Sequence, residues 1–341
     1  MRRVRSSLSG QATSSDFRQP VVDPPREVAS TRGQSALGAV LVAGSALGFA
    51  VMPILGKTAY AHGVAPFALL AWRFLIAAAL LWLLLAVRSR VTSVAMLPLP
   101  RESLGLLLLG GLLLAFEVAL YFLGLQYISA GLAEVLLFLF PAWVVVAVAV
   151  GRRRVPSIVT LVCTAVAVAG AALTIGAYTS GSQVDDRTLA GIAMLLGASV
   201  CYAAYVLIAA NLVQRVGSLR ATTLIVSGAA ASFGVVALLT GAAGPSDPAS
   251  YGVAVAMAVV STVAAFGLLS AGLSHLSASH ASVVATLEPV LAVVLGALVL
   301  AERVAPFQVV GMVMVLAAVA LILWRDGETG QVDREPGRQL E

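Results

Sequence analysis

Four ionisable side chains interrupt long apolar stretches of the chain, and they are the first candidates for chemistry. They are Arg73, Glu117, Glu134 and Glu288. A charged group at the centre of a bilayer costs about 2.5–3.5 kcal/mol on insertion scales, so each one calls for a reason. The planar guanidinium of Arg73 suits the carboxylate of a substrate or of a buried glutamate. A structural ion pair, or an arginine that reaches the membrane surface, is the alternative.

Glu288 is followed directly by Pro289. A carboxyl group in apolar surroundings can take up and release a proton, which would couple substrate movement to proton movement. Because proline has no amide hydrogen, Pro289 leaves the carbonyl of Ala285 without a partner, and a helix kink is predicted there and at Pro141. The alternative for Glu288 is that the Glu-Pro pair only fixes the kink.

Tyrosines accompany these carboxyls at helical spacing. Tyr121 lies one turn after Glu117, on the same helix face, and Tyr202 and Tyr205 place polar tips along another apolar run. Packing without a binding role is the alternative for such aromatic residues. For Glu134, a water-facing position near a helix end and a place on the same polar stripe both stay open. The predicted substrate-binding or coupling residues are Arg73, Glu117, Tyr121, Tyr202, Tyr205 and Glu288.

The motifs of common enzymes are missing from the sequence. It contains no HExxH pair, GxSxG elbow, phosphate loop or cysteine–histidine pairing. Cys163 and Cys201 both fall in apolar runs, where a free thiol behaves as a small apolar group. We therefore expect no enzyme activity, no cofactor and no metal site.

The elements that must hold these residues are transmembrane helices. The sequence is 60% hydrophobic and only 11% charged, which is too apolar for a soluble protein of 341 residues. About 20 apolar residues are needed to cross a bilayer as a helix. Ten such runs occur, at 37–55, 65–87, 104–125, 128–150, 157–175, 189–213, 222–239, 253–273, 281–300 and 307–324. The predicted fold class is an all-α integral membrane protein of ten transmembrane helices.

The positive charges indicate orientation rather than a nucleic-acid surface. Nearly all arginines fall in the tails and in alternate loops, and the other loops carry only Lys57, Arg187 and Arg303. Because basic loops stay in the cytoplasm, both termini are predicted to be cytoplasmic, in a multi-pass protein of the inner (cytoplasmic) membrane. The short 274–280 loop, which should also be inside, carries no lysine or arginine.

Residues 120–150 of the first half resemble residues 268–298 of the second half without gaps. A shift of 148 positions pairs Gly124 with Gly272 and Pro141 with Pro289. The basic turn at 151–154 corresponds to the neutral 301–303, as if inside and outside were exchanged. Because each half has an odd number of helices, the second enters the membrane with opposite orientation, so two inverted five-helix repeats are predicted. The predicted units are a disordered tail at 1–35, a first repeat at 36–176, an external linker at 177–188, a second repeat at 189–324 and a disordered tail at 325–341.

The most telling stretch is SASHASVVATLEPVLAVVLGALVLAERVAPFQVVGMVMVLAAVALIL at 277–323, with LLFLFPAWVVVAVAV at 136–150 as its weaker echo. It resembles the EamA-like members of the drug/metabolite transporter superfamily, which have a Glu-Pro pair and a later glutamate, here Glu302, on and after the ninth helix. The resemblance covers about 36–324 and implies ten helices in two inverted repeats, with export of amino acids or related metabolites. Two departures are Phe140 in place of the first-half glutamate and Gly48 where a tryptophan is common.

The predicted function is a secondary transporter that exports amino acids or related small metabolites by alternating access, with protons as a further partner. A central cavity between the first, third, fourth, sixth, eighth and ninth helices is expected to hold the substrate. A passive channel or facilitator for small polar solutes is one alternative, and a multidrug efflux carrier is another. The expected partners are the substrate and the lipid bilayer, and no nucleic acid is expected. The chain could act as a monomer or as a homodimer.

Overall fold

A computed structural model describes residues 32–92, 100–152, 157–180, 185–242, 244–276 and 278–332, and within these ranges the chain contains helices and no strand. Most of both predicted tails lies outside the described residues. The elements are α1 (Arg32–Ala61), α2 (Pro66–Thr92), α3 (Pro100–Leu108), η1 (Leu109–Leu114), α4 (Ala115–Gly124), α5 (Ala130–Leu137), α6 (Phe140–Arg152), α7 (Ile158–Ser180), α8 (Asp186–Val216), α9 (Ser218–Thr240), α10 (Pro248–Ala258), η2 (Val259–Ala264), α11 (Ala265–Leu273), α12 (Ala278–Ala285), α13 (Leu287–Val299) and α14 (Pro306–Val332).

Each predicted apolar run lies on these helices. In the described chain, eight helical stretches are long and apolar enough to cross a bilayer. Two shorter apolar helices, Leu287–Val299 and Pro306–Leu321, occupy the positions of the ninth and tenth predicted spans. The all-helical membrane fold is thus confirmed as a class.

The third and eighth spans share an irregularity. Each is continuous in length but contains a six-residue π-helix, η1 in Pro100–Gly124 and η2 in Pro248–Leu273. A π-helical turn holds an extra residue, so it rotates the residues that follow it around the helix axis. Glu117 and Tyr121 come just after η1, and Ser261 and Thr262 lie within η2.

The fourth and ninth spans share another irregularity, because both are interrupted in their first halves. The fourth is divided into α5 and α6 at Phe138–Leu139, and the ninth into α12 and α13 at Thr286. Pro141 and Pro289 stand in the first turn of the second piece in each case, where a missing amide hydrogen is tolerated.

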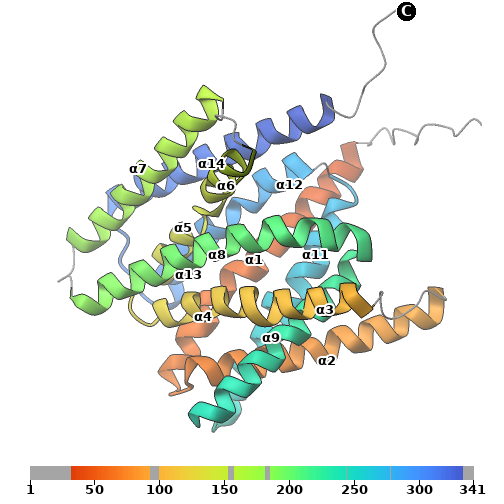
Figure 1. Ribbon diagram of the computed structural model, residues 1–341. Coiled ribbons are helices and arrows are strands. Elements are labelled where there is room, and N and C mark those ends of the chain that lie inside the picture. The colour runs from red at the N-terminus through yellow and green to blue at the C-terminus, as the bar shows by residue number, and fades with distance from the viewer. Residues whose placement is uncertain are drawn as a thin grey trace, which may run out of the picture.

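Helices that are far apart in the sequence pack against each other. The most extensive pairings are α7 with α14 and α2 with α9, while α1 packs on α11 and α13 and α8 packs on α4 and α5. Figure 1 shows α7 and α14 side by side, and α1 begins on the side of the bundle where α14 ends. We call that side the tail end and the opposite side, where α1 leads into α2 and α13 into α14, the far end.

Close crossings in the bundle depend on glycine. A Cβ atom on Gly110 would lie 1.9 Å from the carbonyl oxygen of Ile225, and one on Gly228 would lie 2.1 Å from that of Leu107. The crossing of α7 and α14 is similar. A Cβ atom on Gly170 would lie 2.6 Å from the carbonyl oxygen of Gly311, and one on Gly311 would lie 2.4 Å from that of Gly170. The backbones of these helix pairs therefore touch, as is common in membrane bundles.

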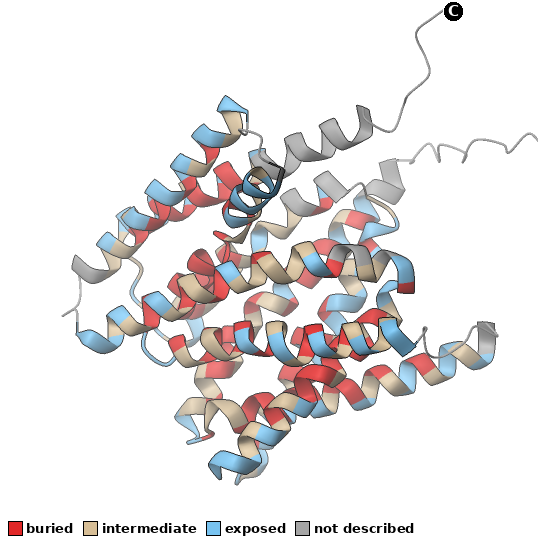
Figure 2. Ribbon diagram, in the orientation of Figure 1, coloured by how far each residue is buried: buried red, intermediate tan, exposed pale blue. Residues whose placement is uncertain are grey.

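Large apolar side chains cover the outside of the bundle. Leu83, Leu112 and Phe116 are among those exposed, and Figure 2 shows exposed residues on the outer faces of helices whose inner faces are buried. A soluble protein avoids apolar surface on this scale. The bundle is built to face lipid.

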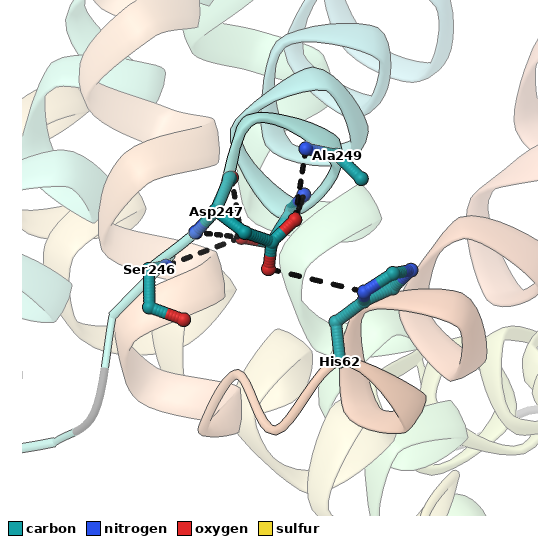
Figure 3. Close-up of polar contacts among 5 residues, drawn as sticks. His62, Ser246, Asp247 and Ala249 are labelled. Atoms are coloured by element: carbon teal, nitrogen blue, oxygen red, sulfur yellow. Dashed lines mark hydrogen bonds and ion pairs between the residues drawn. The ribbon is translucent and has the colours of Figure 1, made fainter.

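At the far end, α10 begins with a capping box that is visible in Figure 3. The Asp247 carboxylate accepts hydrogen bonds from the amides of Ala249 (2.9 Å) and Ser250 (3.0 Å), and the Ser250 hydroxyl lies 3.3 Å from the Asp247 amide. His62, which follows α1, places Nδ1 3.9 Å from the same carboxylate. The hydrogen bonds from Ser250 and Ala249 hold the pKa of Asp247 below its ordinary value of 3.8, with a smaller contribution from His62.

Asp247→Ala is expected to lower the melting temperature of the detergent-purified protein at pH 7, because the first turn of α10 loses its cap. A carboxylate whose folded-state pKa is depressed stabilises the fold above its unfolded pKa, and that stabilisation is lost as the pH falls through the folded-state value. The difference from wild type should therefore shrink below about pH 3.8. Asp247→Asn, which keeps a capping oxygen, serves as the control, and a gap that does not depend on pH would contradict this role for the carboxylate.

Candidate functional site

A cavity of about 420 Å³ lies inside the bundle, and all six predicted site residues line it. The remaining wall is mostly apolar and aromatic. The predicted set of lining helices was incomplete, because α2 contributes Arg73, α9 contributes Thr222 and α14 contributes Val319. The cavity is thus lined by more spans than the sequence predicted.

Arg73 is held on α2 with only part of its hydrogen-bonding capacity used. It is 5% exposed, and its Nε donates to Thr262 Oγ1 of η2 at 3.1 Å. Its Cζ lies 4.9 Å from the ring centroid of Phe74 and 5.7 Å from that of Phe122, where aromatic faces attract a cation. Its Nη1 is buried and has no hydrogen-bond partner among the described residues. This atom is available to a ligand oxygen in the cavity.

Glu117 is the carboxyl group that opposes Arg73. It is 5% exposed, faces the same cavity from α4, and is near enough for the two charges to interact. A buried cation with a buried anion beside it avoids the large penalty of an isolated charge. The two groups therefore interact electrostatically across the cavity, and the Arg73 Nη1 is left without a hydrogen-bond partner among the described residues.

Glu134 and Tyr121 form a second polar unit. The sequence left open whether Glu134 faces water, and the structure buries it completely in α5, where the Tyr121 hydroxyl donates a hydrogen bond to its Oε1. Its other oxygen, Oε2, is buried and has no partner in the part of the chain that the structure describes. The interruption between α5 and α6 and the tight packing of α5 against α8 and α13 turn Glu134 inward.

Glu288 completes the set from the second half of the chain. It lies in the first turn of α13, lines the cavity, and interacts electrostatically with Glu134. Two carboxyl groups in apolar surroundings repel each other when both are ionised, so a proton on either of them relieves the repulsion. The structure thus brings Arg73, Glu117, Tyr121 and Glu288 together around one cavity.

Tyr202 and Tyr205 form an aromatic wall on α8. Their rings stack with centroids 5.9 Å apart, and Phe140 packs edge-on against Tyr202 at 4.7 Å. Phe49 and Phe266 add a second edge-on pair at 5.1 Å on α1 and α11. Phe140, which stands where the family resemblance led us to expect a glutamate, is part of this wall. The wall offers flat apolar faces to a bound molecule.

Sequence reasoning missed one residue that shapes the site, Thr262, and left the position of another, Glu134, open. Thr262 fixes the Arg73 side chain, and the only signal for it was the Ser-Thr pair at 261–262 inside an apolar run. The burial of Glu134 had no local signal, since its spacing fitted both interpretations. Among the described residues, no three histidines, cysteines, aspartates or glutamates lie close enough together to hold a metal ion.

The matches to known proteins decide the family. The model of the EamA-like transporter family matches residues 36–176 and 189–324, which together make up most of the chain. The chain belongs to the EamA-like transporter family. The resemblance inferred from the sequence is therefore confirmed, and the chain is a multi-pass membrane transporter.

Individual relatives agree with this assignment. The transporter is 27% identical over 309 residues to YcbK, an uncharacterized transporter of Bacillus subtilis (strain 168), and the match covers 87% of this chain and 96% of YcbK. A crystal structure that is 18% identical superposes with a TM-score of 0.58, covering 89% of this chain and 99% of the other. The second likeness, at this level of identity, shows the fold alone.

Proposed function

We propose that this protein is a secondary transporter that exports amino acids or related small metabolites through alternating access of its central cavity, with protons bound at the carboxyl groups. One observation carries the proposal. The buried Arg73 and Glu117 of the first half and the partly buried Glu288 of the second half line one cavity whose remaining wall is mostly apolar and aromatic. Such groups are costly in a membrane and mark substrate or proton sites.

The chemistry of the cavity suits a zwitterion. The free Nη1 of Arg73 can receive a carboxylate, Glu117 and Glu288 can receive an ammonium group, and the aromatic wall can cover an apolar body. A volume of about 420 Å³ is within the range of small-molecule pockets.

The architecture that we propose is ten spans in two inverted five-helix halves, with both termini cytoplasmic in the inner membrane. Matching irregularities support it, because π-helices occur in the third and eighth spans and interruptions in the fourth and ninth. The packing supports it too. If the two halves are exchanged, the contact between α1 and α11 becomes the contact between α8 and α4. The α2–α9 and α7–α14 pairs are each exchanged with themselves. Two similar halves allow two similar conformations, one open to each side.

The test is flux in proteoliposomes that contain the purified protein. We expect movement of one or more amino acids that saturates with concentration and accelerates when a pH gradient is imposed. Flux at ion-channel rates that does not saturate would contradict a carrier and favour the channel alternative. Tags placed at the two chain ends should both be accessible from the cytoplasmic side only, and ends on opposite sides would overturn the inverted repeat.

Glu288→Gln tests the proton. Glutamine keeps the size of the side chain but cannot bind and release a proton, so we expect substrate exchange to continue while the acceleration by a pH gradient disappears. The measurement compares flux of the same amino acid with and without the gradient, at equal amounts of folded protein. Glu102→Gln is the control, because Glu102 is partly exposed in the first turn of α3 at the tail end. Unchanged pH dependence in Glu288→Gln would remove Glu288 from the coupling site.

A further inference from the structure

At the far end of the bundle, a carboxylate that does not line the cavity joins the two halves of the chain. Glu302, in the loop after α13, accepts a hydrogen bond from the backbone amide of Ala130 at 2.8 Å to Oε1 and 3.1 Å to Oε2. Lys57, near the end of α1, places its Nζ 3.4 Å from the same Oε1. The contact therefore joins the second half of the chain to two separate elements of the first.

The loop around Glu302 is shaped to make this contact. Ala301 has a φ of 53°, a conformation that residues with a side chain rarely adopt, and the Glu302 amide donates back to the carbonyl of Gly296 at 3.1 Å. A Cβ on Gly296 would lie 2.6 Å from Glu302 Oε2. Backbone strain and a side-chain-free neighbour together aim the carboxylate at the start of α5.

Capping α5 connects this contact to the site. A carboxylate at a helix N-terminus satisfies a free amide and interacts favourably with the helix dipole. Ala130 is the first residue of α5, and Glu134 comes one turn later on the same face. The Ser129 hydroxyl caps the same turn by accepting from the Leu132 amide at 3.2 Å. The position of α5, and with it the Tyr121–Glu134 pair, is therefore set in part by Glu302.

The residues that line the cavity lie nearer the tail end than the far end. Phe122, which lines the cavity near the end of α4, is fully buried, and its carbonyl accepts from the Tyr60 hydroxyl at 2.8 Å. At the tail end, the lining includes Thr222 near the start of α9, whereas on α1 it stops at Met52, well before the far end of that helix at Ala61. The His62–Asp247 contact is a second link between the halves at the far end.

We propose that Glu302, with Ala130 and Lys57, is the latch that keeps the cavity closed at the far end, and that its release accompanies opening to that side. The latch rests on the proposed alternating access, but it concerns a group outside the cavity and can be tested without a substrate. Its chemistry is one charge-assisted cap and one ion pair, partly exposed at 14% for the Glu302 side chain and 25% for that of Lys57. Water can therefore reach and replace both contacts when the helices separate.

The experiment measures access to the cavity from each side of the membrane. The chain has two cysteines, Cys163 and Cys201, so a background with both replaced by alanine allows a single reporter. Met52→Cys places that reporter on α1 in the cavity wall. The protein is reconstituted, and labelling by a membrane-impermeant maleimide is timed separately from the two sides.

In Glu302→Gln, we expect labelling from the far side to rise about tenfold, because the neutral glutamine can still accept from Ala130 but loses the charge that strengthens this cap and pairs with Lys57. Labelling from the tail side should fall in return, because the two conformations exclude each other. A protein that is merely loosened would label faster from both sides, and that result would overturn the latch. Equal labelling of Glu302→Gln and wild type would overturn it as well.

Other variants keep the test decisive if Glu302→Gln does not fold. Lys57→Gln removes only the ion pair and should shift labelling the same way by a smaller factor, whereas Lys57→Arg should behave like wild type. Arg303→Gln removes an exposed charge from the neighbouring residue and should change nothing. Shifted labelling without any amino-acid flux would leave the latch standing and sink the proposed function. Normal flux with unshifted labelling would overturn the latch and leave the proposed function standing.

Discussion

Arg73→Gln is expected to reduce amino-acid flux in proteoliposomes by about a hundredfold or more. The variant loses the one buried guanidinium nitrogen that has no partner in the described residues and that can hold a substrate carboxylate. Truncating one partner of a desolvated charge pair costs about 2–5 kcal/mol, and about 2.8 kcal/mol corresponds to a factor of a hundred in binding. Flux is measured well below saturation, where it reports affinity and turnover together.

The same substitution is expected to lower the melting temperature, because Thr262 loses its hydrogen-bond donor and Glu117 loses the cation that it interacts with. The double variant Arg73→Gln with Glu117→Gln should recover most of the melting temperature, since the orphaned charge is gone, but should not recover transport. Separating the two effects in this way shows whether Arg73 serves the substrate or only the fold.

Arg90→Gln provides the matched control on the same helix. Arg90 is exposed near the tail end of α2, and we expect neither flux nor melting temperature to change by much. If Arg73→Gln transported like wild type once folded, Arg73 would be a structural residue and the carboxylate site would have to lie elsewhere.

Gly110→Val is expected to prevent accumulation of folded protein. The Cβ position at Gly110 lies 1.9 Å from the Ile225 carbonyl oxygen and 2.6 Å from its carbon, so both backbones would have to separate. Overpacking of this kind costs about 4 kcal/mol or more when backbone rather than a flexible side chain is in the way. Gly228→Val, across the same crossing, should have a comparable effect because its Cβ would lie 2.1 Å from the Leu107 carbonyl oxygen.

The glycines at Gly105 and Gly234 are controls on the same two spans. A Cβ at either position meets no described atom within 4 Å. Gly105→Ala and Gly234→Ala should therefore be tolerated, and each replaces a poor helix former with a good one. The measurement is the fraction of protein that elutes as a single species in mild detergent, together with its melting temperature. A well-folded Gly110→Val would mean that η1 and α9 are further apart than described.

The charged residues of the site could be found from the sequence, but their hydrogen-bond partners could not. Arg73, Glu117 and Glu288 could be found because each is a charge in an apolar run, and charge at that depth is rare for energetic reasons. That they would face one cavity followed from the same cost. The partners of these residues could not be found this way, because Thr262 is 189 positions from Arg73 and hydroxyls are inexpensive in a helix.

The sequence also did not show which face of each helix points to the interior of the bundle. In a soluble helix, the apolar face marks the core. In this bundle the side toward lipid is apolar and so is the side toward the interior, as exposed Leu112 and buried Leu106 illustrate within one span. The depth and rotation of Glu134 therefore had no local signal, and its contact with Tyr121 came from the interruption after α5 and from packing on α8 and α13.

The sequence by itself determined that the chain crosses a membrane many times, which family it belongs to, and which charged residues are costly enough to be functional, because these depend on composition and on the free energy of burying charge in lipid. Only the tertiary structure decided that Glu134 is buried beside Tyr121, that Thr262 orients Arg73, and that Glu302 caps α5 from the other half. Those contacts depend on helix rotation and on backbone approach at glycines, and apolar sequence carries little information about either.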